Sequence, residues 1–185
     1  MKGSRMKRPI LNKIFRDLVL QIAFFMLLLA AVNQLQTSGL VSGVARQFLL
    51  AGTNVTEQLV PQRSVEKKIS IVYFMAPWCG VCRISVPYLN SLRKDMPDVN
   101  IQIIALDYDS TDDVTAFVKR YKIDLPVFFG TEAVRDFWGV SAYPSYFVID
   151  EAMVIRSKAV GYSTKFGMIF RVLWTKVLDR IFWWD

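Results

Sequence analysis

Histidine is absent from this chain of 185 residues, and cysteine occurs only twice. The missing histidine excludes Ser-His-Asp and Cys-His catalysis, as well as any metal site that needs an imidazole ligand. Two cysteines alone cannot complete a four-thiolate zinc site within one chain. We therefore predict neither a bound metal nor a cofactor, and any chemistry must come from the cysteines.

The excess of positive charge lies mostly in the N-terminal tail. The formal charge is +7, but residues 1–17 hold six basic residues and one acidic residue. The rest of the chain has 17 basic and 15 acidic residues, so its net charge is only +2. No basic stripe of the kind that binds nucleic acid is present, and we predict no nucleic-acid partner.

An uncharged apolar run follows the tail at residues 18–35, "LVLQIAFFMLLLAAVNQL". Its length is close to the roughly 20 residues that span a bilayer, and the basic residues before it predict a cytoplasmic N-terminus. A cleaved signal peptide is the alternative, because Ala30 and Ala31 end the strongest apolar stretch. A buried core helix is disfavoured, because the run is apolar on all faces.

The predicted organisation is a basic cytoplasmic tail (1–17), a transmembrane anchor (18–35), a linker rich in small residues (36–46) and one domain (47–185). An extended segment near residues 47–50 is expected to begin the domain. Both the anchor and the signal reading place the domain outside the cytoplasm, where a disulfide can persist.

Strands and helices are predicted to alternate along the domain. Apolar runs predict strands at 69–75, 99–106 and 125–130, and a final antiparallel pair at 145–150 and 153–160. Helices are expected at 80–94, from the Ser110 cap onward, at 131–138 and at 164–182. This order is typical of an α/β fold with a mixed central sheet flanked by helices. The last helix carries an apolar stripe made of Phe166, Ile169, Phe170, Leu173, Val177 and Ile181.

Both cysteines lie in "FMAPWCGVCRISVP", residues 74–87, between the first predicted strand and helix. A Cys-x-x-Cys pair in this context is typical of a redox site. The positive end of the helix would stabilise a thiolate on Cys79, while Cys82 lies one turn further in. We therefore expect Cys79 to attack and Cys82 to resolve the mixed disulfide. A purely structural disulfide would close a tiny loop and add little stability.

The motifs "APWCGVC" and "AYPSYFVID", with Pro87 five residues after Cys82, resemble the thioredoxin fold over roughly residues 45–182. The resemblance implies that Pro144 occupies the position of the cis-proline facing the cysteines. It also implies that Trp78 and Tyr143 contact the substrate, with Ser145 as a further hydrogen-bonding group. Plain packing is the alternative for these flanking residues.

The N-terminal anchor and "YPSYFVID" resemble the membrane-tethered thiol–disulfide oxidoreductases of the bacterial periplasm. The ending "GYSTKFGMIFRVLW" is most similar to the suppressor-of-copper-sensitivity D branch. The residues at two positions differ from those of related reductases. Thioredoxin has a buried Asp where this chain has Tyr73. Cytochrome c maturation reductases have a Glu where this chain has Ser85.

The leading hypothesis is an enzyme, a membrane-tethered thiol–disulfide oxidoreductase that acts on protein cysteines through Cys79 and Cys82. The alternatives are a dedicated reductase for cytochrome c maturation or metal handling, and a copper(I)-binding thiol module. The expected partners are client proteins with cysteines or disulfides and a membrane protein that supplies electrons. The expected location is the bacterial inner membrane, crossed once, with the catalytic domain in the periplasm.

Overall fold

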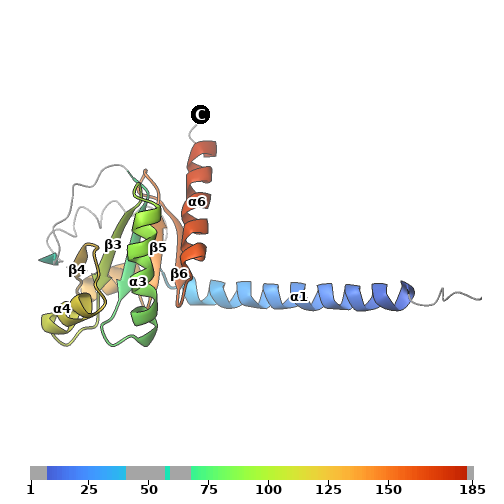
Figure 1. The fold of residues 1–185 in the computed structure, drawn as a ribbon, viewed down its shortest axis with the longest axis horizontal. Coiled ribbons are helices and arrows are strands. Elements are labelled where there is room, and N and C mark those ends of the chain that lie inside the picture. The colour runs from blue at the N-terminus through green and yellow to red at the C-terminus, as the bar shows by residue number, and fades with distance from the viewer. Residues whose placement is uncertain (1–7, 41–56, 59–67, 183–185) are drawn as a thin grey trace, which may run out of the picture. The chain divides into compact units, whose positions relative to one another are not determined.

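The computed structural model describes residues 8–40, 57–58 and 68–182 (Figure 1). The chain divides into two compact units, Met1–Ser38 and Gly39–Asp185. The extended segment expected near residues 47–50 and residues 41–46 of the predicted linker lie outside the described residues.

The described residues of the first unit form one helix, α1, from Arg8 to Thr37. Its stretch Phe15–Thr37 is long and apolar enough to cross a membrane, and its most apolar window of 18 residues has a mean hydropathy of 2.1 and no buried residue. The helix begins ten residues before the predicted span and includes the first two residues of the predicted linker. It can start early because Lys and Arg favour helix and Pro9 is tolerated in a first turn.

The second unit is built on a mixed sheet with strand order β1-β4-β3-β2-β5-β6. β2, β3 and β4 run parallel, whereas β1 pairs with β4, β5 with β2, and β6 with β5 in antiparallel fashion. The predicted hairpin at the end of the domain is thus confirmed. The strands are β1 Glu57–Gln58, β2 Ser70–Met75, β3 Asn100–Ala105, β4 Val127–Phe129, β5 Ser145–Ile149 and β6 Ile155–Val160.

The four helices predicted for the domain are also present. α3 begins directly after Cys79 and contains Pro87, and α4 starts at a capping box between Ser110 and Asp113. α5 ends at Gly139, whose φ of 65° is a left-handed conformation that glycine adopts without strain. The helices are α3 Gly80–Asp95, α4 Thr111–Arg120, α5 Glu132–Trp138 and α6 Lys165–Phe182.

The two faces of the sheet bury separate apolar clusters because successive strand residues point to opposite sides. Along β2, Tyr73 packs with residues of α3, α4 and α6, whereas Phe74 packs with residues of α5, including Trp138. Figure 1 shows α3 and α6 beside each other on the sheet. The helix that carries the cysteines therefore rests on a fully buried strand.

The apolar stripe predicted on α6 is present, but it is not the face that packs on the domain. Phe166, Phe170, Leu173 and Val177 are exposed, and Ile169 packs partly against the core. The side chain of Ile181 lies outside the described part of the structure. Met168, Val172 and Thr175 form the buried face instead. Two ion pairs, Lys165–Asp95 and Lys176–Asp98, link α6 to the end of α3 and to the loop after it, and they are compatible only with this orientation of the helix.

Candidate active site

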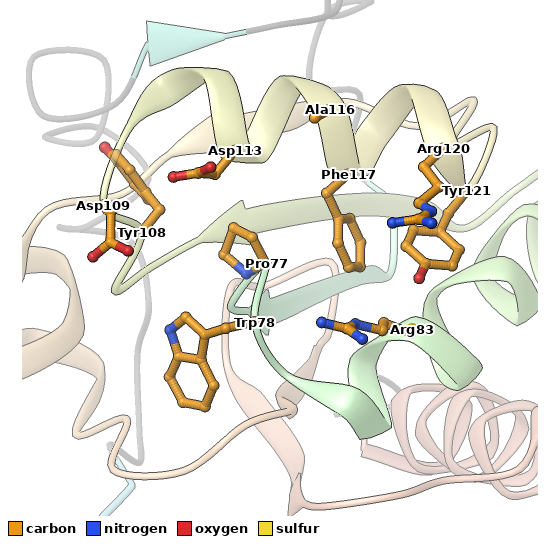
Figure 2. Close-up of a pocket in the computed structure, with 10 residues that line it drawn as sticks. All are labelled: Pro77, Trp78, Arg83, Tyr108, Asp109, Asp113, Ala116, Phe117, Arg120 and Tyr121. Carbon is orange, nitrogen blue, oxygen red and sulfur yellow. The ribbon is translucent and has the colours of Figure 1, made fainter.

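A pocket of about 270 Å³ opens beside the turn that joins β2 to α3 (Figure 2). Pro77 and Trp78 line it from this turn, and Phe117 and Tyr121 line it from α4 and the residue that follows. Trp78 is 60% exposed, although it follows a strand that is buried along its whole length. The end of a buried strand thus delivers the cysteine motif to the surface.

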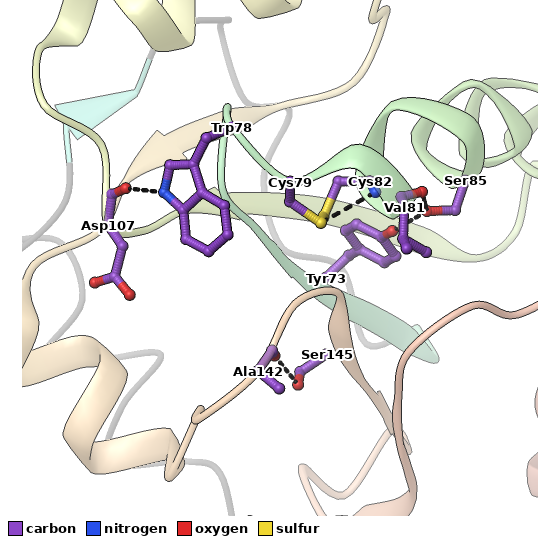
Figure 3. The surroundings of a disulfide bond; sticks show 9 residues. All are labelled: Tyr73, Trp78, Cys79, Val81, Cys82, Ser85, Asp107, Ala142 and Ser145. Carbon is purple, nitrogen blue, oxygen red and sulfur yellow. Dashed lines mark hydrogen bonds between the residues drawn. A yellow bond between two sulfur atoms is a disulfide. The ribbon is translucent and has the colours of Figure 1, made fainter.

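Cys79 and Cys82 form a disulfide at the N-terminus of α3 (Figure 3). Cys79 is the N-cap residue of the helix, and its Sγ accepts a hydrogen bond of 3.2 Å from the backbone N–H of Cys82. The free N–H groups and the positive dipole end of a helix favour negative charge at this position. In the reduced protein the same contact would stabilise a thiolate on Cys79.

The two sulfurs differ in their access to solvent. Cys79 retains 5% of its exposure and borders the exposed Trp78, whereas Cys82 is fully buried among core residues of α3. A client sulfur can therefore approach Cys79 from the surface but cannot approach Cys82. This geometry agrees with the predicted roles, which remain predictions.

A pair of neutral hydroxyl groups lies next to the cysteine turn of α3. Tyr73 on β2 is hydrogen-bonded to Ser85 on α3 at 2.6 Å, and Ser85 donates to the carbonyl of Val81 at 2.9 Å. Because the single hydroxyl hydrogen of Ser85 is used for Val81, Tyr73 is the donor of the shared bond. Burial raises the pKa of Tyr73 well above its ordinary value, so its hydroxyl stays protonated.

The structure thus brings together the two positions at which this sequence lacks the acids of related reductases. Tyr73 and Ser85 are twelve residues apart, and the sequence alone gives no sign of their contact. A buried carboxylate at either position would carry charge next to the cysteines, whereas the hydroxyl pair is neutral.

Asp107 links Trp78, Tyr143 and Arg135 on the other side of the site. These contacts could not be read directly from the sequence. The Asp107 carboxylate accepts a hydrogen bond from the Tyr143 hydroxyl at 2.9 Å and pairs with Arg135 at 3.1 Å. Its backbone carbonyl accepts the indole N–H of Trp78 at 2.7 Å. Its φ of 47° lies in the left-handed region, which Asp tolerates better than most residues. The sequence feature that could have indicated this role is the position of an acidic residue soon after a predicted buried strand.

The loop before β5 completes the site, and the Tyr143–Pro144 peptide bond is cis, as the resemblance implied. The rings of Trp78 and Tyr143 meet edge to face at 5.8 Å, so these two predicted contact residues lie together. Burial and the hydrogen bond to Asp107 raise the pKa of Tyr143, which keeps it neutral. Ser145 was expected to be a further hydrogen-bonding group for the substrate. It is instead fully buried, and its hydroxyl donates to the Ala142 carbonyl at 2.7 Å.

We expect Asp107→Asn to lower the free energy of unfolding by about 1 kcal/mol, as is common when a partly exposed charged pair and hydrogen bond are lost. Asn tolerates the same backbone conformation, so the change isolates the carboxylate. Urea unfolding of the full chain in detergent, followed by tryptophan fluorescence, measures the loss. The control is Asp109→Asn, an exposed acid nearby, and equal losses in both variants would contradict the role of Asp107.

Among the described residues, no group of three or more His, Cys, Asp or Glu side chains is placed to hold a metal ion. The two sulfurs are the soft ligands of this site, and here they are joined to each other. The arrangement is suited to exchange of a disulfide with another thiol.

A family model described as the AhpC/TSA family matches residues 42–158, which is more than half of the chain. The chain belongs to the AhpC/TSA family. Within this family match lie the cysteine pair, Trp78, Asp107 and the loop at Pro144. The fold is thioredoxin-like, which confirms the fold class expected from the sequence.

Several relatives carry names that describe disulfide chemistry. "Thiol-disulfide oxidoreductase ResA" of Bacillus cereus is 30% identical over 116 residues, which cover 61% of this chain and 66% of the relative. The protein of the same name from Oceanobacillus iheyensis is 24% identical over 155 residues, covering 80% of this chain and 81% of the relative. The chain thus spans about two thirds of the length of the first of these relatives.

A solved structure has the same architecture. The thiol:disulfide interchange protein of the thioredoxin family from Chlorobium tepidum is 26% identical, with a TM-score of 0.54. The superposition covers 59% of this chain and 80% of that chain. The names of these proteins agree with the class of enzyme expected from the cysteine motif.

Proposed function

We propose that this member of the AhpC/TSA family is a membrane-tethered thiol–disulfide oxidoreductase that exchanges disulfides with the cysteines of client proteins. The observation that carries the proposal is the pairing of Cys79, which keeps a small exposed surface at the N-terminus of α3, with a fully buried Cys82. The names of the relatives support the same chemistry.

In the reducing direction, the Cys79 thiolate attacks one sulfur of a client disulfide and displaces the other client sulfur as a thiolate. The thiolate of Cys82 then attacks Cys79 Sγ, closes the Cys79–Cys82 disulfide and releases the second client thiolate. Two electrons pass from the pair to the client, and the two protons lost by the pair balance those that the client thiolates take up. The oxidising direction reverses both steps.

Trp78, Tyr143 and Pro144 are the proposed contact residues for the client. Trp78 and Tyr143 form one aromatic wall beside Cys79, tied together by Asp107. Aromatic rings held in this way offer a preorganised apolar surface to a client segment. The client chain would lie along this wall while its sulfur is bound to Cys79.

The reduced full chain in detergent should reduce the disulfides of insulin, and Cys79→Ser should abolish this activity. Lys94→Gln, an exposed change at the far end of α3, serves as the control that keeps it. The consumption of the protein dithiol is measured with a thiol reagent in a single turnover. Reduction of insulin by Cys79→Ser at the unchanged rate would refute the proposed role of the pair.

The proposed location is the bacterial inner membrane, with α1 crossing once and the domain in the periplasm. The apolar stretch Phe15–Thr37 and the basic residues before it support this orientation. We expect a reporter that is active only in the cytoplasm to be silent when it is fused after Asp185. The same fusion lacking residues 1–35 is the control and should be active, and activity of the full-length fusion would contradict the orientation.

The finer proposal, membership of the suppressor-of-copper-sensitivity D branch, is supported by the resemblance of residues 161–174. In this proposal the reduced clients would be proteins of metal handling or of cytochrome c maturation. A membrane protein would supply the electrons. A copper(I) titration of the reduced chain separates these oxidoreductase readings from the copper-binding module, because tight stoichiometric binding by the two thiolates is expected only of the module.

A further inference from the structure

The pocket beside Trp78 carries positive charge at one end. The side chains of Arg83, in the first turn of α3, and Arg120, in the last turn of α4, both line it. Figure 2 shows the two guanidinium groups at the same end, next to Phe117. Two elements that are far apart in the sequence thus bring two cations to one apolar surface.

Neither arginine has a partner within the part of the chain that the structure describes. Other cations of the domain, such as Arg135 and Arg156, are held by carboxylates, but no carboxylate oxygen of the described residues lies within 4.0 Å of a side-chain nitrogen of Arg83 or Arg120. Asp113, at the opposite end of the pocket, is engaged by the N–H and hydroxyl of Ser110 at 3.0 and 2.9 Å. The arginine end therefore has unused donors that can form a forked pair with a carboxylate.

The pocket is connected to the reactive sulfur through the backbone. Trp78 precedes Cys79, and the N–H of Arg83 donates to the carbonyl of Cys79 at 3.3 Å. A client residue two positions from the cysteine that is bound to Cys79 reaches at most about 7 Å along an extended chain. The residues that flank a client cysteine can therefore lie beside Trp78, which lines the pocket.

The size of the pocket indicates the kind of ligand. A volume of about 270 Å³ is below the roughly 300–1,000 Å³ of sites for whole cofactors or drug-sized molecules. It suits one or two side chains of a client. Phe117 and Pro77 supply apolar walls that strengthen an ion pair formed beside them.

We propose that the arginine end of this pocket binds an acidic side chain located near the client's exchanged cysteine. The inference rests on the proposed function, and it adds a substrate class: client segments with Asp or Glu a few residues from the cysteine. The aspartates Asp109 and Asp113 at the other end would repel an acid placed there, so the preference also sets the direction in which the client lies.

The test compares two disulfide-bridged peptides that differ only by Glu or Gln two positions after the first cysteine. The reduced full chain in detergent should reduce the Glu peptide roughly fivefold faster at low salt, as two exposed ion pairs allow. The ratio of the two second-order rate constants should fall towards one at high salt. Using this ratio cancels any effect of a substitution on the reactivity of Cys79 itself.

The variants identify the source of the preference. The double variant Arg83→Gln/Arg120→Gln should bring the ratio to about one, Arg83→Glu/Arg120→Glu should invert it, and Lys94→Gln should leave it unchanged. Equal reduction of both peptides by the wild type, or a ratio that survives the double Gln variant, would overturn the pocket assignment while the proposed function stands. If neither peptide is reduced, the proposed function fails and this inference fails with it.

Discussion

Cys82→Ser is expected to accumulate as mixed disulfides with client proteins, whereas Cys79→Ser should trap almost none. Cys82 is fully buried, so a protein that keeps only this thiol presents no sulfur to a client. With Cys79 alone, attack succeeds but no second thiol releases the client. We expect at least roughly tenfold more trapped complex for Cys82→Ser, because attack depends on access to a thiolate.

The measurement is acid quenching of cells, alkylation of free thiols and non-reducing electrophoresis of the tagged full chain. The double variant, in which both cysteines are Ser, is the matched control and defines the background. Equal trapping by the two single variants would show that the burial of Cys82 does not decide which cysteine attacks.

The reduction potential of the Cys79–Cys82 pair is expected to lie above thioredoxin's roughly −270 mV and below the roughly −120 mV of strong oxidants. The hydroxyl pair of Tyr73 and Ser85 is neutral, so no carboxylate at either position opposes a thiolate on Cys79. The helix N-terminus then stabilises the reduced form and raises the potential. Gly80 and Val81 supply no positive charge between the cysteines, which keeps it below the upper limit.

Ser85→Glu should reverse part of this effect and lower the potential by roughly 30 mV, which corresponds to about 1.4 kcal/mol for two electrons. A charged carboxylate beside the pair destabilises the thiolate and hence the reduced form. Ser85→Gln has the same size without the charge and is the matched control. Glutathione-equilibrium titration of the full chain in detergent gives all three values.

Two results would contradict this account. A wild-type potential at or below that of thioredoxin would show that the missing acids do not set it. Equal potentials for the Glu and Gln variants would show that the shift comes from disturbed packing at Ser85 rather than from charge.

The sequence by itself was enough to predict the four helices of the domain, strands β2 to β6 and the redox-type cysteine pair, but not the short strand β1. Strand β2 is a continuous run of apolar and β-branched residues, and α4 starts at a Ser and an Asp three residues apart. Such signals are local, because capping and strand preference depend on residues that are neighbours in the chain. The position of Cys79 at a helix N-terminus follows from the same local pattern, and the structure confirms it.

The face on which α6 packs was decided only by the tertiary structure. Periodicity shows which residues share a side of a helix, but it does not show which side meets the sheet. The wider stripe with Phe166 and Phe170 is the more apolar one, yet Met168 and Val172 are buried. The ion pairs of α6 with Asp95 and Asp98 depend on residues distant in the sequence.

The surroundings of the cysteines show the same division. Tyr73 and Ser85 could be singled out as departures from related reductases, but their hydrogen bond exists only because α3 lies across β2. Asp107 contacts Trp78 and Tyr143 because the fold places the ends of β2 and β3 next to the loop before β5. A motif specifies the reactive atoms locally, whereas the groups that tune and orient them are brought in from other parts of the chain by packing.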